Sequence, residues 1–125
     1  MPRKIVLKPK WLSAVEEHDF DAAESYLELI YTSKRAAKMV TALRHAKASR
    51  FKAKDIFRAS RLSLLGISNS HIDKDRQKIA SGISLSPILL VRDMKNGKVV
   101  VADGYHRLCA VYQFDEDAWV PCRIV

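Results

Sequence analysis

Residues 103–107 near the C-terminal end have the side chains and backbone that bind an anion. They read Asp-Gly-Tyr-His-Arg and follow a β-branched run at 99–101. This order predicts a strand, a tight turn and then the start of a helix. Unpaired backbone N–H groups at a helix N-terminus bind phosphate, and an adjacent imidazole and guanidinium add charged donors. The stretch therefore predicts a phosphate-binding turn.

Each residue of this turn has an expected role. Gly104 can adopt a positive φ and lets a ligand approach the backbone closely. Arg107 is expected to stabilise phosphate charge, and His106 to donate a hydrogen bond or transfer a proton. Asp103 is expected either to cap the helix or to help hold Mg²⁺. The simpler alternative is a capped helix whose His106 and Arg107 are ordinary surface residues.

The elements that must position this turn lie in the second half of the chain. Pro87 opens a continuous apolar run, which is typical of a strand buried on both faces. Asn96-Gly97 is a strong hairpin signal, and Gly82 ends a polar helix. The pattern predicts an extended segment at 62–67, a turn at 69–71, helices at 73–81 and 104–114, and strands at 88–91, 99–101 and 119–125. An acidic loop at 115–117 is expected to be solvated.

The first 60 residues are predicted to be a helical N-terminal extension. Apolar spacing predicts a helical hairpin of 21–31 and 33–47, followed by a short helical segment at 51–60. Asp19 or Asp21 is the expected cap of the first helix, and Ser33 of the second. The residues expected to face inward are Ala23, Tyr26, Leu27, Ile30, Ala36, Ala37, Val40 and Leu43, with Phe51, Ile56 and Phe57 as anchors of the third segment. Residues 1–18 are expected to form an arm docked by Trp11 and Leu12.

Length and composition predict a single folded domain, 1–125, of the α/β (α+β) class. The chain has 125 residues, 48% of them hydrophobic and 29% charged. No apolar run approaches a membrane span, so no membrane partner is expected. Cys109 and Cys122 lie among apolar neighbours, which favours reduced core thiols and a cytoplasmic location.

The net charge of +8 is concentrated in the first half of the chain. Within 31–58, nine Lys and Arg residues stand against Asp55 alone. Such a stripe can neutralise the phosphates of a nucleic acid, with Lys34, Arg35 and Lys38 as candidate contacts. The simpler interpretation is a solvated helix face, because no aromatic residues are interleaved with these cations in the pattern of base-stacking platforms.

The motif-bearing part resembles the ParB/sulfiredoxin superfamily over about 70–125. Gly104-Tyr105-His106-Arg107 with Ala110, preceded by the strand 85–91, is similar to the G-E-R-R-x-x-A turn and P-I-x-V strand of ParB and to the G-C-H-R of sulfiredoxin. In those families this turn binds nucleotide phosphates: CTP in ParB, ATP in sulfiredoxin, and a nucleotide phosphoryl donor in a related free-serine kinase. The resemblance implies that Gly104, His106 and Arg107 hold phosphates.

Two departures narrow what the resemblance implies. Tyr105 stands where sulfiredoxin has its catalytic cysteine, so sulfinic-acid reduction is not expected. ParB continues beyond this region into DNA-binding and dimerisation segments, whereas this sequence ends at Val125, so partition-complex assembly is not expected either. Residues 1–60 match neither family.

A second cluster, His71, Asp73, Asp75 and Arg76, lies where it could face the His106-Arg107 turn across the end of the sheet. Asp73 or Asp75 would then accept a proton or carry Mg²⁺; the alternative is a polar helix N-terminus whose acids are favoured by the helix dipole. His18 and His45 have no partners at metal-ligand spacing, so no protein metal site is predicted.

Three hypotheses follow. The leading one is a nucleotide-phosphate-binding domain for CTP, ATP or ADP that hydrolyses the nucleotide or transfers its phosphoryl group with Mg²⁺. Its predicted catalytic residues are His106 and Arg107, and its predicted nucleotide-binding residues are Asp103, Gly104, Tyr105, His106 and Arg107. The second is a nucleic-acid-binding, nuclease-like module that uses the basic 31–58 face. The third is an interaction protein with an empty pocket. The oligomeric state is left open.

Overall fold

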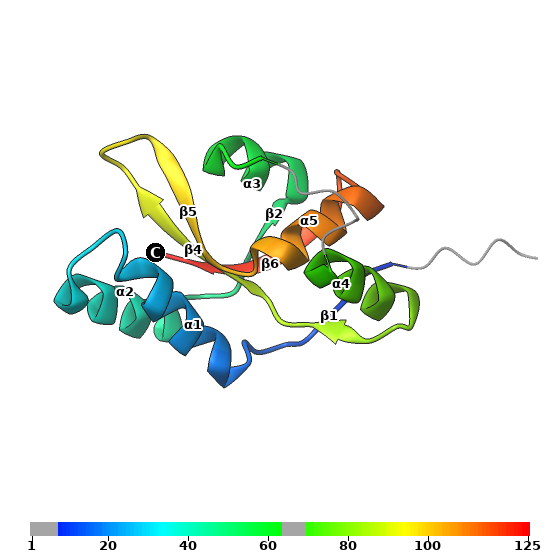
Figure 1. Ribbon diagram of the computed structural model, residues 1–125, viewed down its shortest axis with the longest axis horizontal. Helices are drawn as coiled ribbons and strands as arrows, with labels where there is room; N and C mark the ends of the chain where they lie inside the picture. The colour runs from blue at the N-terminus through cyan, green and yellow to red at the C-terminus, as the bar shows by residue number, and fades with distance from the viewer. Residues whose placement is uncertain (1–7, 64–69) are drawn as a thin grey trace, which may run out of the picture.

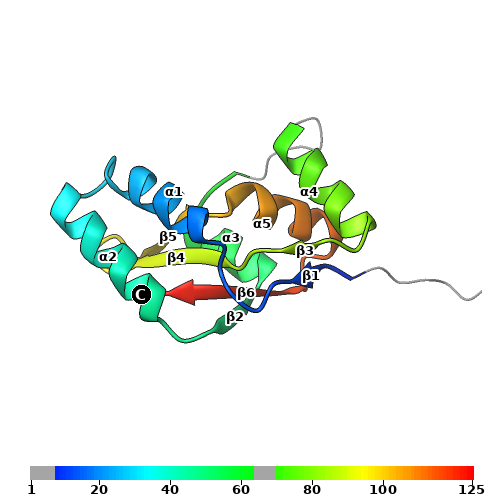
Figure 2. The ribbon, with the colours of Figure 1, turned by 90° about the horizontal axis from the view of Figure 1, so that it is seen from below.

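The chain folds as a mixed β-sheet with helices packed on it (Figures 1 and 2). The structure is a computed structural model that describes residues 8–63 and 70–125. The helices are α1 (Glu17–Leu27), α2 (Ser33–His45), α3 (Ala53–Ser60), α4 (Ser70–Ala80) and α5 (Tyr105–Phe114). The strands are β1 (Lys10–Trp11), β2 (Ser49–Lys52), β3 (Ser84–Leu85), β4 (Ile88–Asp93), β5 (Lys98–Asp103) and β6 (Trp119–Ile124).

The main sheet has the strand order β2-β6-β4-β5 and contains both kinds of pairing. β4 pairs antiparallel with β5 through the predicted Asn96-Gly97 hairpin, and parallel with β6. β2 pairs antiparallel with β6 and forms one edge, and β5 forms the other. A separate two-stranded sheet joins β1 to β3 in parallel. The predicted small mixed sheet and α+β class are confirmed.

β4 separates two apolar clusters, as its continuous hydrophobic run predicted. Alternate strand residues point to opposite faces. Leu89 and Val91 pack with the apolar residues of α1 and α2, whereas Ile88 and Leu90 pack with those of α3, α4 and α5. Both faces of β4 are therefore buried over residues 88–91.

The predicted helical hairpin of α1 and α2 is present, but its boundaries and caps differ. α1 begins at Glu17 after Glu16, so neither Asp19 nor Asp21 is its cap. Thr32, not Ser33, caps α2 by accepting a hydrogen bond from the Arg35 backbone at 3.3 Å. Because Phe20 joins Ala23 and Leu27 in the buried face of α1, burial rather than local capping sets where this helix starts.

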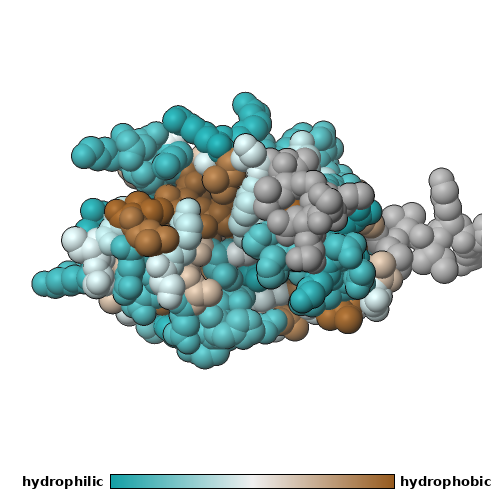
Figure 3. Space-filling view, in the orientation of Figure 1, coloured by the Kyte–Doolittle hydropathy of each residue, from teal (hydrophilic) through white to brown (hydrophobic). Residues whose placement is uncertain are grey.

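Three residues predicted to face the core in this hairpin are exposed instead: Tyr26, Ile30 and Ala37. α1 ends at Leu27, so Ile30 lies in the turn that follows the helix. Figure 3 shows a hydrophobic patch in this region on an otherwise largely hydrophilic face. Trp11 packs against the core as predicted, whereas Leu12 is exposed.

The predicted helix over 51–60 is wrong in its first residues. Ser49–Lys52 is the edge strand β2, and the helix α3 starts only at Ala53. Pairing with β6 supplies the reason, since a partner strand distant in sequence overrides the local helical pattern. Phe51 is consequently exposed, while Ile56 is buried as predicted.

The predicted helices and strands of the second half of the chain agree more closely with the structure. The strands at 88–91, 99–101 and 119–125 and the helix at 104–114 are confirmed within a few residues. α4 begins at Ser70, so the predicted turn at 69–71 is partly helix, and Gly82, with φ of 71°, follows its end. The extended segment predicted at 62–67 lies mostly outside the described residues.

Both cysteines are buried and not disulfide-bonded, as predicted for core thiols. Burial raises the pKa of the Cys122 thiol to about 11. Among the described residues, no helix combines the length and the apolar character needed to cross a membrane.

Replacing Leu27 by Ala should destabilise the fold by about 3 kcal/mol, because its side chain is fully buried between α1 and the sheet. Leu29→Ala is the matched control: this leucine is two residues later and 83% exposed, so the change should cost less than about 0.5 kcal/mol. Urea unfolding of both variants measures the difference. Equal costs would show that α1 does not pack on the sheet in this way.

Candidate functional site

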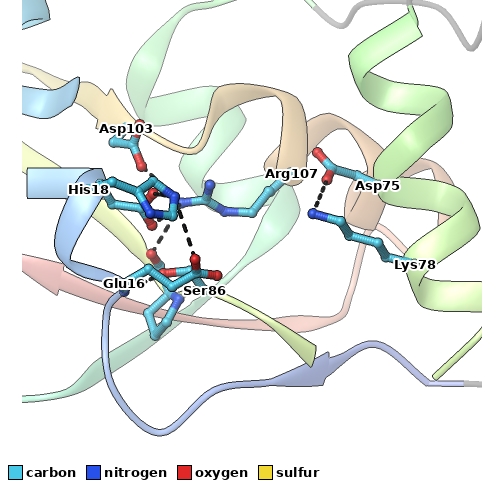
Figure 4. A network of polar contacts seen from close by, with 9 residues as sticks. Glu16, His18, Asp75, Lys78, Ser86, Asp103 and Arg107 are labelled. Atoms are coloured by element: carbon cyan, nitrogen blue, oxygen red, sulfur yellow. Dashed lines mark hydrogen bonds and ion pairs between the residues drawn. The ribbon is translucent and has the colours of Figure 1, made fainter. Parts of the chain in front are cut away.

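A pocket of about 390 Å³ lies where the N-terminus of α5 meets α4 and the start of α1. Residues Asp103 to Arg107 form one wall of it. The α4 side of the pocket carries His71, Lys74, Asp75 and Lys78, and His106 lies on the α5 side. A further acidic group consists of Glu16, Asp19 and Asp103. Figure 4 shows Arg107 extending toward Asp103, with Asp75 and Lys78 on the other side.

Arg107 is bonded to two carboxylates and a carbonyl. Its Nη2 lies 3.0 Å from Asp103 Oδ2, 3.3 Å from Asp19 Oδ2 and 3.4 Å from the Pro87 oxygen. The side chain is 17% exposed, and its Nε is buried with no hydrogen-bond partner among the described residues. Arg107 therefore joins α5 to α1, to the end of β5 and to the residue before β4.

Asp19 and Asp103 form a carboxylate pair around this guanidinium. The Asp19 side chain is 5% exposed and the Asp103 side chain 17% exposed. Burial raises the pKa of Asp103, and the charge of Asp19 and a hydrogen bond between the two carboxyl groups act in the same direction, while Arg107 opposes them. Asp103 therefore holds a proton more readily than an isolated aspartate does. Asp103 does not cap α5, since the N-cap is Gly104.

Gly104 provides the space that Arg107 occupies. Its φ is 102°, a conformation that side chains disfavour. A Cβ at this position would lie 2.9 Å from Arg107 Nη2 and 3.0 Å from Ile88 Cγ1. The first bond of the α5 ladder runs from Leu108 N to Gly104 O at 2.9 Å. The amides of residues 105–107 thus precede that ladder, at the positive end of the helix dipole.

His106 stacks against His71 from α4, with ring centroids 4.8 Å apart and planes inclined by 31°. Burial and the neighbouring His71 lower the pKa of His106, and Asp75 opposes this shift. The neutral imidazole is therefore favoured at pH 7, and it offers one donor and one acceptor nitrogen.

Only part of the second predicted cluster reaches the pocket. His71 and Asp75 line it, whereas Asp73 accepts a hydrogen bond from Gln77 at 3.0 Å and Arg76 lines a different cavity. Asp75 is buried, and this burial raises its pKa against the opposing charges of Lys78, Arg107 and the two histidines. Its nearest cation is Lys78, whose Nζ lies 3.9 Å from Asp75 Oδ1.

Tyr105 lines the pocket, but its hydroxyl is already engaged. It donates to the Ser63 carbonyl, and the ring packs edge-on against Phe57 at 6.4 Å between centroids. Burial raises the pKa of Tyr105 to about 12. The residue connects the start of α5 to the end of α3.

The sequence-based prediction missed Asp19 as a site residue. Asp19, Ala23 and Leu27 are spaced by four residues, so a carboxylate on the buried face of a helix was the available signal. His18 and Glu16 were also missed: His18 Nε2 lies 3.2 Å from Asp19 Oδ1 and 3.4 Å from Glu16 Oε2. The Glu16 amide donates to Ser86 Oγ at 3.1 Å, which anchors the start of α1 to the strand side of the pocket.

The basic residues Lys34, Arg35 and Lys38 are exposed on α2, away from this pocket, to which α2 contributes no lining residue. Arg35 lies over the Tyr31 ring at 4.9 Å. In the part of the chain that the structure describes, no group of three or more His, Cys, Asp or Glu residues could hold a metal ion.

Comparison with known proteins identifies no relative. No family model matches the sequence, no curated protein matches it, and no solved structure matches the fold.

Gly104→Ala should destabilise the protein by at least about 2 kcal/mol, because it adds a clash with Arg107 and Ile88 to an unfavourable φ. Gly97→Ala is the matched control. Gly97 also has a positive φ, of 63°, but a Cβ there meets nothing within 4 Å, so about 1 kcal/mol is expected. Thermal or urea unfolding measures both, and a Gly104 cost no larger than that of Gly97 would contradict the close packing of Arg107.

Asp75→Asn should stabilise the protein at pH 7, and the gain should shrink toward pH 4. The folded state raises the pKa of Asp75, so the stability linked to this group is present below its unfolded pKa and is lost as pH rises through the folded value. Asparagine does not ionise, so the variant does not lose this stability as the pH rises. Unfolding at both pH values measures the effect, with Asp73→Asn on the exposed side of α4 as control. A gain equal at both pH values would show that charge burial is not its cause.

Proposed function

We propose that the protein binds the phosphates of a nucleotide in this pocket and hydrolyses it or transfers its phosphoryl group. The observation that carries the proposal is that one cavity combines two lysines, a helix N-terminus and the Asp19–Asp103 carboxylate pair. Phosphoryl transfer needs charge stabilisation for the phosphate and a group that takes a proton from the attacking oxygen.

The phosphates would lie against the N-terminus of α5. His106 donates a hydrogen bond from its neutral ring, and Lys74 and Lys78 supply charge from α4. Arg107 Nη2 is bonded to carboxylates, so it acts first by holding the turn in place, and any contact with phosphate comes from its remaining donors. Gly104 lets Arg107 lie against the turn, which fixes the shape of the site.

Asp103, with Asp19, would accept the proton of the attacking hydroxyl or water. Burial and the neighbouring carboxylate raise the pKa of Asp103, which brings a carboxylate closer to the range useful for a general base. Mg²⁺ bound to the phosphates would neutralise their charge. Mg²⁺ needs only one or two protein carboxylates when phosphates provide other ligands. Asp103, beside Asp19, would hold such an ion only in place of its role as the base.

The ParB/sulfiredoxin resemblance of the turn leads to the same ligand class: CTP, ATP or ADP. A cytoplasmic location, expected from the reduced cysteines, would give access to all three.

Calorimetric titration with CTP, ATP and ADP in the presence of Mg²⁺ tests the proposal. We expect at least one to bind, and His106→Ala and a Lys74→Ala/Lys78→Ala pair each to weaken it about tenfold, since a charged hydrogen bond contributes about 1.5–3 kcal/mol. Asp103→Asn should lose phosphate release or transfer, because asparagine cannot accept the proton.

A Lys34→Gln/Lys38→Gln pair is the control, because these lysines lie outside the pocket and should not affect nucleotide binding. If none of the three nucleotides binds, the proposal fails. If the pocket variants change no measured binding, an interaction protein with an empty pocket becomes the better explanation.

A further inference from the structure

One half of a sheet face is left without an apolar helix layer. Val120 and Cys122 of β6 point into the cluster under α3 and α5, so Trp119, Pro121 and Arg123 point to the opposite face. The cluster under α1 and α2, on that opposite face, takes strand residues from β4 and β5 and includes no described residue of β2 or β6. The helix layer formed by α1 and α2 ends just after α2, where Arg123 Nη1 donates a hydrogen bond to the Ala46 carbonyl at 3.0 Å.

Trp119 lies on this uncovered half with two cations. Antiparallel pairing sets Lys52 opposite Trp119 and Arg50 opposite Pro121, so all four side chains share one face. The Arg50 guanidinium lies 4.7 Å and the Lys52 ammonium 5.4 Å from the centre of the Trp119 ring. Trp119 still remains 49% exposed, so part of its ring is open to a partner.

The charge of this surface is positive. Asp117 is the neighbouring acid, and it is engaged by Lys54 at 2.6 Å and more loosely by Lys52 at 4.0 Å. Arg50 forms no salt bridge with any carboxylate in the described ranges 8–63 and 70–125. Its charge is therefore available to a partner.

We propose that this β2–β6 surface binds single-stranded nucleic acid, with a base stacked on Trp119 and backbone phosphates held by Arg50 and Lys52. An exposed aromatic ring beside cations on an open sheet face is the chemistry that recognises unpaired bases. Duplex bases are already stacked and cannot offer a face to one tryptophan.

The sequence does not predict such a platform, because Trp119 is 67 residues from Lys52 in the chain. The antiparallel pairing of β2 with β6 brings the two residues together. None of these residues lines the nucleotide pocket, so this proposal is independent of the first.

Fluorescence anisotropy of labelled oligo(dT) and oligo(U) of about 12 nucleotides, a length within the range of a single stacking site, tests the proposal. Trp119→Ala should weaken binding about tenfold or more, and Trp119→Phe less, because phenylalanine keeps an aromatic face. Arg50→Gln should weaken binding and reduce the slope of log affinity against log salt by about 0.7, the value for one single-strand phosphate contact. A duplex should bind at least about tenfold more weakly than the single strand.

A Trp11→Phe background leaves Trp119 as the sole tryptophan, and its emission should be quenched when the oligonucleotide binds. Thermal unfolding confirms that each variant is folded. Loss of affinity in Lys34→Gln/Lys38→Gln together with unchanged affinity in Trp119→Ala would overturn the proposal in favour of the α2 stripe. Absence of binding at low salt, or equal binding of heparin and oligonucleotide with no quenching, would also overturn it.

Discussion

The contact of Arg107 with Asp19 and Asp103 is the constraint on which the arrangement of the pocket depends. It connects the first helix, the end of β5 and the last helix through one guanidinium. Removing a cation from water is costly, so such a contact persists only where the geometry and hydrogen bonds are good. The absent side chain at Gly104 allows Arg107 to reach these partners. Loss of Arg107 would leave the two carboxylates facing each other without this cation, so the guanidinium is the member on which the group depends.

This constraint also determines what the pocket can bind. Since Nη2 of Arg107 is shared between two carboxylates, an incoming phosphate meets a guanidinium that is already partly neutralised. Lys74, Lys78 and the helix N-terminus must therefore provide most of the attraction for an anion. In the proposed function, the same carboxylates would supply a proton acceptor next to that anion, a combination that a purely basic pocket would lack. The proposed binding and acid–base chemistry would thus depend on neighbouring parts of one cavity.

Much of the fold was predictable because several elements carry strong local signals. The apolar run of β4, the Asn96-Gly97 turn and the helix after Gly104 each follow from residue types that have few alternative conformations. The predictions failed where contacts with residues distant in the sequence determined the local structure. Phe51 and Lys52 were predicted to begin a helix and instead lie in β2, because β6 pairs with them. Asp19 looks like a helix cap and is instead buried, because its side chain has Arg107 as a partner.

The sequence by itself determined the turn at 103–107 and the strand and helix around it, since turn chemistry and hydrophobic periodicity are local properties. Only the tertiary structure decided which side chains meet at that turn. Asp19 and Arg107 are 88 residues apart, and Lys52 and Trp119 are 67 apart, so no spacing in the chain predicts either contact. Burial selects such partners through packing and the pairing of charge in a region that excludes water, and these are properties of the folded chain as a whole.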